Sequence, residues 1–388
     1  MIYSVRQKTD VKNVQDAHFQ ALMNNRKIII RGCMKKNNFI KNILLTAMFS
    51  TALAGCDFAS APKDEIHADG KTMGTFFSIT VVGDYPGGQK GLDKDADEVL
   101  RKINKEISTF DKDSLLSKFN NSKSTAQFRI TQDMADILIE SLRVGNDLDG
   151  ATDITVGPLV NLWGFGPKKV EQQDRIPTDE EISAARANIG LDKLHVEISK
   201  NAAYVRKDNP DIYVDLSTVG EGYGADKLAE LLDRKGVQNY MVSVAGAIRT
   251  KGVNNRGKDW VIAIEDPSNE HAVGRNVIVP VCTKGQAIST AGSYRNYISS
   301  KDGKTFSHII DPATGKPVDH KTVSVTVVGP TALWTDAVDT GLMVKGGEEA
   351  LRYANERNIA IYVVTRNAKD DGFETHYSRA MHRYLECE

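Results

Sequence analysis

Two carboxylates and a hydroxyl stand at helical spacing late in the chain, in residues 335–340 (TDAVDT). Positions i, i+3 and i+4 share one face of a helix, so Asp336, Asp339 and Thr340 converge on one spot. Because all three ligands are oxygen and none is His or Cys, the set favours Mg2+, or another hard cation such as calcium or manganese, over zinc or copper. The alternative interpretation is a solvated acidic helix face.

A histidine precedes this helix, in residues 307–317 (SHIIDPATGKP). His308 follows a predicted strand and comes before a turn that contains Pro and Gly. Phosphoryl or nucleotidyl transfer needs a positioned base near a metal-bound phosphate, and imidazole suits that role at neutral pH. A lone His is often structural, so the hypothesis depends on the neighbouring motifs.

A glycine-spaced segment lies in residues 215–226 (DLSTVGEGYGAD). The pattern predicts a strand, a turn with glycines at 220, 222 and 224, and a helix that begins at Ala225. Such glycines allow a backbone to approach a ligand closely, and the free N–H groups of a helix N-terminus attract an anion such as phosphate. A bare flexible turn is the alternative. The spacing differs from G-x-G-x-x-G, which argues against a Rossmann site.

These segments occur together with Met73-Gly-Thr75 and with residues 153–159 (DITVGPL), in an order typical of one family. From about residue 73 to about residue 364, the chain resembles the ApbE family, the FAD:protein FMN transferases of bacterial envelopes.

The resemblance implies a set of site residues. The Thr218 carbonyl would complete the metal shell of Asp336, Asp339 and Thr340. His308 would be the catalytic base. Phe110 stands where Tyr is common, and Glu221 where many relatives carry Lys. Arg295 could pair with a phosphate or form a buried ion pair. The cofactor-binding residues would be Met73, Phe110, Ala151, Thr152, Asp153, Asp215, Glu221 and Ile309.

The resemblance also implies an activity. FAD would be the donor, and a Ser or Thr hydroxyl of an acceptor flavoprotein would receive FMN through a phosphoester bond, with release of AMP. The acceptors would be subunits of sodium-pumping NADH:quinone oxidoreductase or of Rnf-type complexes. Two alternatives use the same site: a FAD-binding carrier lipoprotein without transfer, and a magnesium-dependent FAD pyrophosphatase that gives FMN and AMP.

The pattern of apolar residues favours an α+β domain with a mixed, largely antiparallel sheet and flanking helices. Helices and strands are intermixed without regular βαβ alternation. The predicted helices cover residues 90–108, 131–148, 225–236 and the segment around 336–340. The predicted strands cover residues 76–82, a hairpin within 194–216 whose last strand is 211–216, and 240–244, 260–265, 277–282, 306–310, 323–328 and 359–364.

The composition is that of a soluble globular protein. The net charge of −1, from 50 basic and 51 acidic residues, gives no electrostatic basis for binding nucleic acid. Cys282 lies in an apolar run and reads as a small buried hydrophobe, and no CxxC pattern suggests zinc or a redox centre.

The N-terminus carries a targeting signal. Residues 34–41 (MKKNNFIK) are basic, a short apolar run follows, and residues 53–56 (LAGC) resemble a bacterial lipobox that ends in Cys56. We therefore expect residues 1–33 to be a leader outside the native protein, with the start at Met34, and residues 34–55 to be a lipoprotein signal peptide. Cys56 would be lipidated, residues 56–69 would form a tether, and residues 70–388 would form the transferase domain. Asp57 favours retention in the inner membrane, facing the periplasm.

Overall fold

The computed structural model describes residues 62–167, 176–267, 277–293, 297–299, 305–369 and 372–387. These residues belong to one unit that runs from Ser60 to Glu388. The leader, the signal peptide, Cys56 and Arg295 lie outside the described residues, so the predictions for them stay predictions. In the described part, no helix is both long and apolar enough to cross a membrane.

An eight-stranded sheet is the centre of the fold, and every neighbouring pair in it is antiparallel. Among the described residues, a three-stranded sheet has the order β3, β5, β4. Three two-stranded sheets join β8 with β9, β11 with β12, and β13 with β14. The order of the large sheet is β1 (Glu65–Thr72), β2 (Thr75–Val82), β6 (Tyr240–Val244), β7 (Ala247–Lys251), β10 (Ala287–Gly292), β15 (Thr322–Gly329), β16 (Ala360–Arg366) and β17 (Phe373–Tyr377). The remaining strands are β3 (Phe128–Ile130), β4 (Leu194–Ser199), β5 (Ala202–Lys207), β8 (Val261–Glu265), β9 (Val277–Cys282), β11 (Tyr297–Ser299), β12 (Thr305–Ser307), β13 (Ile310–Asp311) and β14 (Lys316–Pro317).

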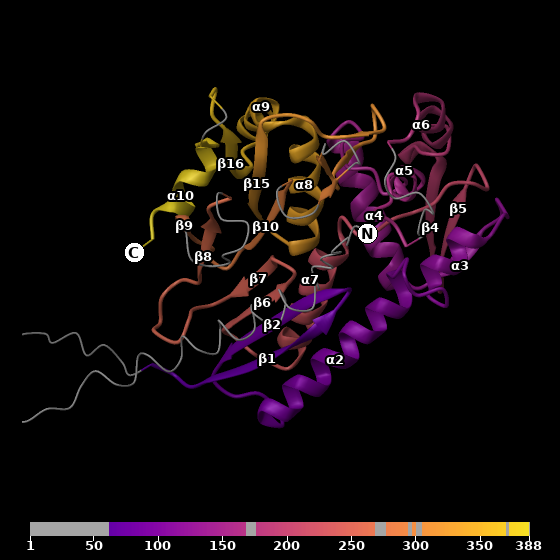
Figure 1. Cartoon of the computed structure of the whole chain (residues 1–388). Coiled ribbons are helices and arrows are strands. Elements are labelled where there is room, and N and C mark those ends of the chain that lie inside the picture. Colours follow the sequence, from indigo (N-terminus) through magenta and orange to yellow (C-terminus); the bar gives the residue numbers. More distant parts are fainter. Residues whose placement is uncertain are drawn as a thin grey trace, which may run out of the picture. The chain divides into compact units, whose positions relative to one another are not determined.

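The helices gather mainly on one face of this sheet (Figure 1). α8 (Ala332–Lys345) packs on β10 and β15, and it also contacts α4 (Gln132–Asp147) and α7 (Gly220–Arg234). The purple helix α2 runs alongside β1 in Figure 1. The helices are α2 (Gly88–Ile107), α3 (Leu115–Asn121), α4 (Gln132–Asp147), α5 (Gly157–Leu162), α6 (Asp179–Arg186), α7 (Gly220–Arg234), α8 (Ala332–Lys345), α9 (Gly347–Arg357) and α10 (His382–Leu385), with short 3-10 turns at Leu191–Lys193 and Arg379–Met381.

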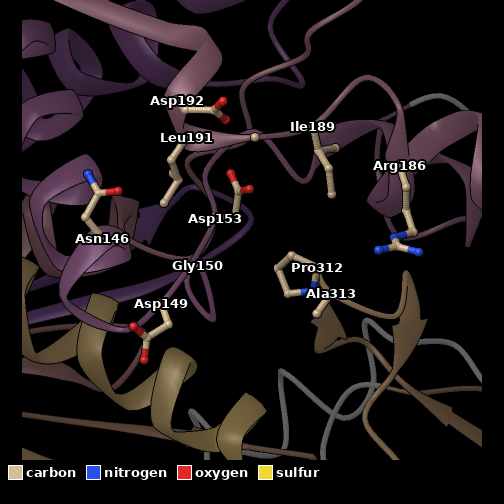
Figure 2. Close-up of a pocket in the computed structure, with 11 residues that line it drawn as sticks. Asn146, Asp149, Gly150, Asp153, Arg186, Ile189, Leu191, Asp192, Pro312 and Ala313 are labelled. Carbon is tan, nitrogen blue, oxygen red and sulfur yellow. The ribbon is translucent and has the colours of Figure 1, made fainter.

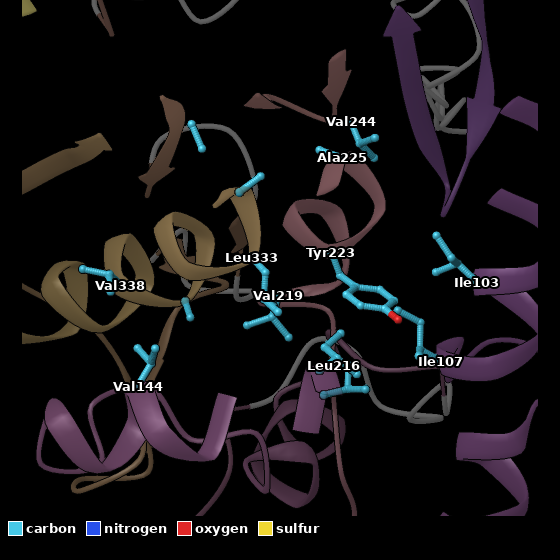
Figure 3. Close-up of a cluster of buried hydrophobic side chains, with 14 of the residues drawn as sticks. Ile103, Ile107, Val144, Leu216, Val219, Tyr223, Ala225, Val244, Leu333 and Val338 are labelled. Atoms are coloured by element: carbon cyan, nitrogen blue, oxygen red, sulfur yellow. The ribbon is translucent and has the colours of Figure 1, made fainter. Parts of the chain in front are cut away.

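Alternation along the strands divides the core between the two faces of the sheet. In β16, Ile361 and Val363 join the large core under the helices, whereas Tyr362 and Val364 join a second core under the C-terminal segment. Figure 3 shows part of the large core, where Val219, Tyr223 and Leu333 are buried between helices. The α+β class with a largely antiparallel sheet is therefore confirmed.

An acidic residue with two lysine partners joins three of the helices. Asp133 of α4 pairs with Lys102 of α2 at 2.5 Å and with Lys227 of α7 at 3.0 Å. Burial alone would raise the pKa of Asp133, but hydrogen bonds from both lysines hold it below the usual value. The carboxylate is therefore stabilised in its charged form.

Two predictions about the segment before α7 are wrong. Residues 211–216 are not a strand, because they form only a single bridge, from Tyr213 to Val156. The glycines are not a turn, because α7 begins at Gly220 and includes all three of them. A Cβ on Gly222 would lie 2.3 Å from the carbonyl oxygen of Ala332 in α8, so packing between the helices, rather than helix propensity, explains this glycine.

The ordered domain also begins earlier than expected. β1 starts at Glu65 and pairs along its length with β2, so residues 65–69 belong to the sheet and not to the tether. Met73 and Gly74 form the two-residue turn between these strands, with φ of 50° and 76°. Positive φ at both positions is the geometry that fits the twist of a hairpin.

A disulfide closes the C-terminal end of the fold. It joins Cys282 of β9 to Cys387, with a Cα–Cα distance of 5.5 Å. Cys282 is buried, as expected, but it is not a free hydrophobe as we predicted. The two cysteines are 105 residues apart, and the sequence did not predict the pair because spacing alone does not show which cysteines meet.

Candidate active site

The acids of α8 are buried and lie at the contact between α7, α8 and β10. Asp336 is 9% exposed and Asp339 is 1% exposed, so neither is part of a solvated surface. Thr331 begins the helix by accepting a hydrogen bond from the Trp334 N–H at 3.2 Å. The alternative interpretation of a solvated acidic face is therefore wrong.

Each oxygen of Asp336 accepts a hydrogen bond. Oδ2 accepts from the Gly222 N–H at 2.8 Å, and Oδ1 accepts from the Ser289 hydroxyl at 3.3 Å. Burial raises the pKa of Asp336 to about 7, although both hydrogen bonds oppose this. The carboxylate is thus fixed in place but costly to ionise.

Asp339 has an unsatisfied oxygen. Its Oδ1 accepts a hydrogen bond from the Thr340 hydroxyl at 3.3 Å, but its buried Oδ2 has no hydrogen-bond partner among the described residues. Burial, and then the charge of Asp336, raise the pKa of Asp339 well above its usual value. A buried polar atom without a partner costs free energy unless a ligand satisfies it.

A third carboxyl group, that of Glu221, interacts with Asp336. Burial, and then the charge of Asp336, raise the pKa of Glu221 to about 8. In the described part of the chain, no basic side chain forms an ion pair with Glu221, Asp336 or Asp339. A buried acidic cluster of this kind is stabilised by a cation, since the charges otherwise repel each other without water to screen them.

The donor set suits a hard cation. No group of three His, Cys, Asp or Glu side chains at metal-binding distance occurs among the described residues. The predicted set does not require one, because it has two carboxylates, the Thr340 hydroxyl and the Thr218 carbonyl. These are oxygen donors, and the free Oδ2 of Asp339 can serve as one of them, so the residues present fit Mg2+.

The loop that contains residues 151–153 is connected to the same helix. The Thr152 hydroxyl is buried and donates to the Ala337 carbonyl of α8 at 2.6 Å. Asp153 Oδ1 accepts from the N–H and the hydroxyl of Thr155, at 2.7 and 2.6 Å, and burial raises its pKa. Ala151 is half-buried beside them.

The segment before α7 is connected to this loop. The Asp215 N–H donates to the Ile154 carbonyl at 2.8 Å, and the Asp215 side chain accepts from the Ser217 N–H at 2.9 Å. Asn120 of α3 holds the backbone of Val214 through two hydrogen bonds of 2.8 Å. The neighbouring Thr218, whose carbonyl is a predicted metal ligand, lies at the end of this ordered segment.

A cavity of about 440 Å³ is lined in part by Asp153, and Figure 2 shows the residues around it. Asp192 and Arg186 lie on its sides, and Pro312 forms part of the opposite wall. Pro312 comes four residues after His308, so the cavity lies between two motifs that are far apart in sequence. Its volume is within the range of small-molecule sites.

The other predicted residues lie around these elements. Met73 packs towards α7, since its Cε is 3.4 Å from where a Cβ on Gly224 would lie. Phe110 is 72% exposed, which leaves its ring open to a flat ligand. His308 lies between β12 and β13, half-buried, with its ring 6.4 Å from that of Phe165, and Ile309 beside it is buried. The proximity of His308 to Asp336 and Asp339 stays a prediction.

Three residues at this site have roles that the sequence did not predict. Ser289 comes from β10, and no motif in the sequence points to it, whereas Asp226 of α7 ends the glycine-spaced segment 215–226 but received no role. Gly222 was noticed, but as a residue for ligand approach rather than for contact with α8. Only the folded chain brings these residues next to the acids.

Comparison with known proteins identifies the family of this chain. Residues 73–363 match the ApbE family. The chain belongs to the ApbE family. The FAD:protein FMN transferase of Escherichia coli K12 is 44% identical over 353 residues, which cover 89% of this chain and 97% of that protein. The FAD:protein FMN transferase of Vibrio cholerae is 40% identical and covers 89% of this chain and 99% of its own length.

Solved ApbE structures share the fold. The flavin transferase ApbE from Vibrio cholerae has a TM-score of 0.73 at 39% identity and covers 84% of this chain and 100% of its own. The apo form of the Pseudomonas stutzeri flavinyl transferase ApbE has a TM-score of 0.74 at 32% identity and covers 84% and 98%. The single ApbE-type domain predicted from the motifs is thus confirmed.

Proposed function

We propose that this chain is a FAD:protein FMN transferase that uses magnesium to move FMN from FAD to a Ser or Thr hydroxyl of an acceptor flavoprotein, with release of AMP. The observation that supports it best is the buried pair of acids on α8, in which one carboxylate oxygen of Asp339 has no hydrogen-bond partner among the residues that the structure describes. Relatives at 40–44% identity are named FAD:protein FMN transferases, which supports the transfer of FMN from FAD to a protein.

In this proposal the chain's oxygen donors hold the metal. The ligands are the side chains of Asp336, Asp339 and Thr340 and the carbonyl of Thr218. Bound there, Mg2+ would neutralise pyrophosphate charge and stabilise the departing AMP oxygen. The hydrogen bonds from Gly222 and Ser289 keep Asp336 pointing into the cluster.

The FAD-binding residues orient the donor. Phe110 offers an open ring for stacking on the flavin, and Met73 and Ile309 supply apolar contacts. The 151–153 loop, Asp215 and Glu221 add polar contacts. Because Thr152 and Asp215 are hydrogen-bonded to the protein itself, they fix the shape of the site before FAD enters.

His308 is the proposed base. It accepts the proton of the acceptor hydroxyl while that oxygen forms a bond to the FMN-side phosphorus. The phosphorus–oxygen bond to AMP breaks, and AMP leaves with the bridging oxygen. The products are the phosphoester-linked FMN and AMP.

We further propose that the protein acts as a lipid-anchored periplasmic enzyme of the inner membrane. The lipobox at Cys56 supports this, and so does the Cys282–Cys387 disulfide, because disulfides persist in oxidising compartments. The partners would be flavoprotein subunits of sodium-pumping NADH:quinone oxidoreductase or of Rnf-type complexes.

The test is mass spectrometry of such a subunit after incubation with FAD, Mg2+ and the protein. An FMN adduct on a Ser or Thr is the expected result. Free FMN with AMP would instead indicate the pyrophosphatase, and unchanged FAD would indicate a carrier. Addition of EDTA should stop transfer, and full activity in EDTA would exclude the metal.

The role of His308 is tested by His308→Ala, which should abolish transfer while FAD remains bound. The matched control is His195→Ala, because His195 pairs with Asp208 at 2.8 Å on the surface of the small sheet and should be dispensable. Unaltered transfer by His308→Ala would remove this residue from the mechanism.

A further inference from the structure

α7 contacts the acidic helix α8 at two points, one helical turn apart on each helix. Gly222 of α7 donates its N–H to Asp336 at 2.8 Å. Asp226, four residues further along α7, meets the N-terminus of α8 at Ala332, which lies four residues before Asp336. Because i and i+4 share a helix face, these two points fix both the distance and the register between the helices.

The Asp226 carboxylate acts as a cap for α8 from a different helix. Its Oδ1 accepts from the Ala332 N–H at 2.9 Å, and its Oδ2 accepts from the Leu333 N–H at 2.8 Å. These two N–H groups have no partner within α8, and a negative charge at a helix N-terminus is stabilising. Thr331 satisfies the next N–H group, so the first turn of the acidic helix is fully bonded.

Arg249 strengthens the same contact from the neighbouring strand. Its Nε lies 3.8 Å from Asp226 Oδ1, and its guanidinium donates to the Pro330 carbonyl just before α8. The side chain of Asp226 is 15% exposed, so water screens these interactions little. Both oxygens of Asp226 therefore accept hydrogen bonds from α8, and its charge interacts with Arg249.

We propose that Asp226 is a positioning residue for FMN transfer. It sets the register of α8 on α7 and thereby holds Asp336 and Asp339 where they can bind the metal. This inference deepens the proposed function and depends on it for the task of the two acids. Asp226 does not contact the reacting groups. It acts through the helix that carries them.

The experiment compares three variants of the full chain. Asp226→Asn keeps the shape but loses the charge and one acceptor oxygen, and Asp226→Ala loses the cap. Thr331→Ala is the matched control, because it removes an N-cap hydrogen bond from the same helix, to the Trp334 N–H, and leaves both bonds from α8 to Asp226 in place. Each variant is measured for Mn2+ affinity without FAD by electron paramagnetic resonance, for kcat and KM of FMN transfer, and for its urea midpoint.

We expect Asp226→Asn to weaken Mn2+ binding about 10-fold and to lower kcat by a similar factor, which is the size of effect that residues supporting metal ligands have. The KM of Asp226→Asn for FAD should stay within about twofold of the wild type. The Mn2+ affinity of Thr331→Ala should also stay within about twofold of the wild type. Both variants should lower the urea midpoint, because each removes a hydrogen bond from the first turn of α8. If Asp226→Ala does not fold, Asp226→Asn still decides the question.

Two outcomes would overturn the inference: wild-type Mn2+ affinity and kcat in Asp226→Asn, or equal losses in Asp226→Asn and Thr331→Ala. If the wild type itself binds no Mn2+, the metal assignment fails, and kcat then decides. A loss of kcat in Asp226→Asn that is absent from Thr331→Ala would keep Asp226 as a positioning residue, and equal kcat values would reject it.

Discussion

Gly222→Ala should disrupt the contact that holds the acidic helix in place. A Cβ at this position would lie 2.3 Å from the Ala332 carbonyl oxygen and 2.8 Å from Asp336 Cβ. Both are backbone or near-backbone atoms of a packed helix, so neither can turn away. Since non-bonded carbon contacts are optimal near ~3.5–4.0 Å, α7 and α8 must separate by roughly 1 Å.

The expected change in unfolding free energy combines two destabilising effects and one stabilising effect. Overpacking of this kind costs about 1–3 kcal/mol, and a weakened hydrogen bond from Gly222 to Asp336 adds about 1 kcal/mol. Replacing a helical glycine with alanine returns about 1 kcal/mol of helix propensity. The variant should therefore be about 1–3 kcal/mol less stable than the wild type.

Gly224→Ala is the matched control, two residues along the same helix. A Cβ there would lie 3.4 Å from Met73 Cε and 3.7 Å from the Val244 side chain, which are ordinary contacts. Only the gain in helix propensity remains, so this variant should be up to about 1 kcal/mol more stable than the wild type. The same substitution thus has opposite signs at two nearby positions.

Urea unfolding of the two variants, with FMN transfer measured alongside, checks this prediction. Gly222→Ala should also lose transfer activity, because Asp336 moves with α8. The reasoning would be refuted if Gly222→Ala were as stable as Gly224→Ala, since α7 and α8 would then not be in close contact at this glycine.

Three other changes test separate parts of the molecule. Cys387→Ser should lower the unfolding free energy by about 2–4 kcal/mol, because it frees a long loop, and reduced wild type should match it in urea unfolding. Asp133→Asn should cost about 1 kcal/mol at pH 7 and less near pH 3, which urea unfolding at both pH values would show. The sign follows from the lowered pKa of Asp133 in the folded state, so its contribution is present above the ordinary pKa and is lost as the pH falls. Phe110→Ala should leave stability within about 0.5 kcal/mol of the wild type, because the ring is exposed, yet raise the KM for FAD about 2- to 10-fold in steady-state kinetics. An unchanged KM would exclude flavin stacking on this residue.

Local patterns in the sequence predicted the elements that have strong periodicity. The apolar spacing of α2 and the Thr131 cap of α4 were predicted correctly, because each of these signals depends only on residues that are close together in the sequence. The strands 211–216 and 306–310 were wrong: the first forms a single bridge, and the second is interrupted at His308. Short apolar runs do not reveal whether a partner strand is present.

The sequence by itself determined the chemical types of the site: the spacing of Asp336, Asp339 and Thr340 on one helical face is a property of residue order alone. Tertiary structure decided that these acids are buried, that Gly222 and Ser289 donate hydrogen bonds to Asp336, and that Asp226 caps the helix that carries them. The physical reason is that burial and hydrogen bonding depend on contacts between α7, α8 and β10, which are separated by dozens of residues and meet only when the core forms.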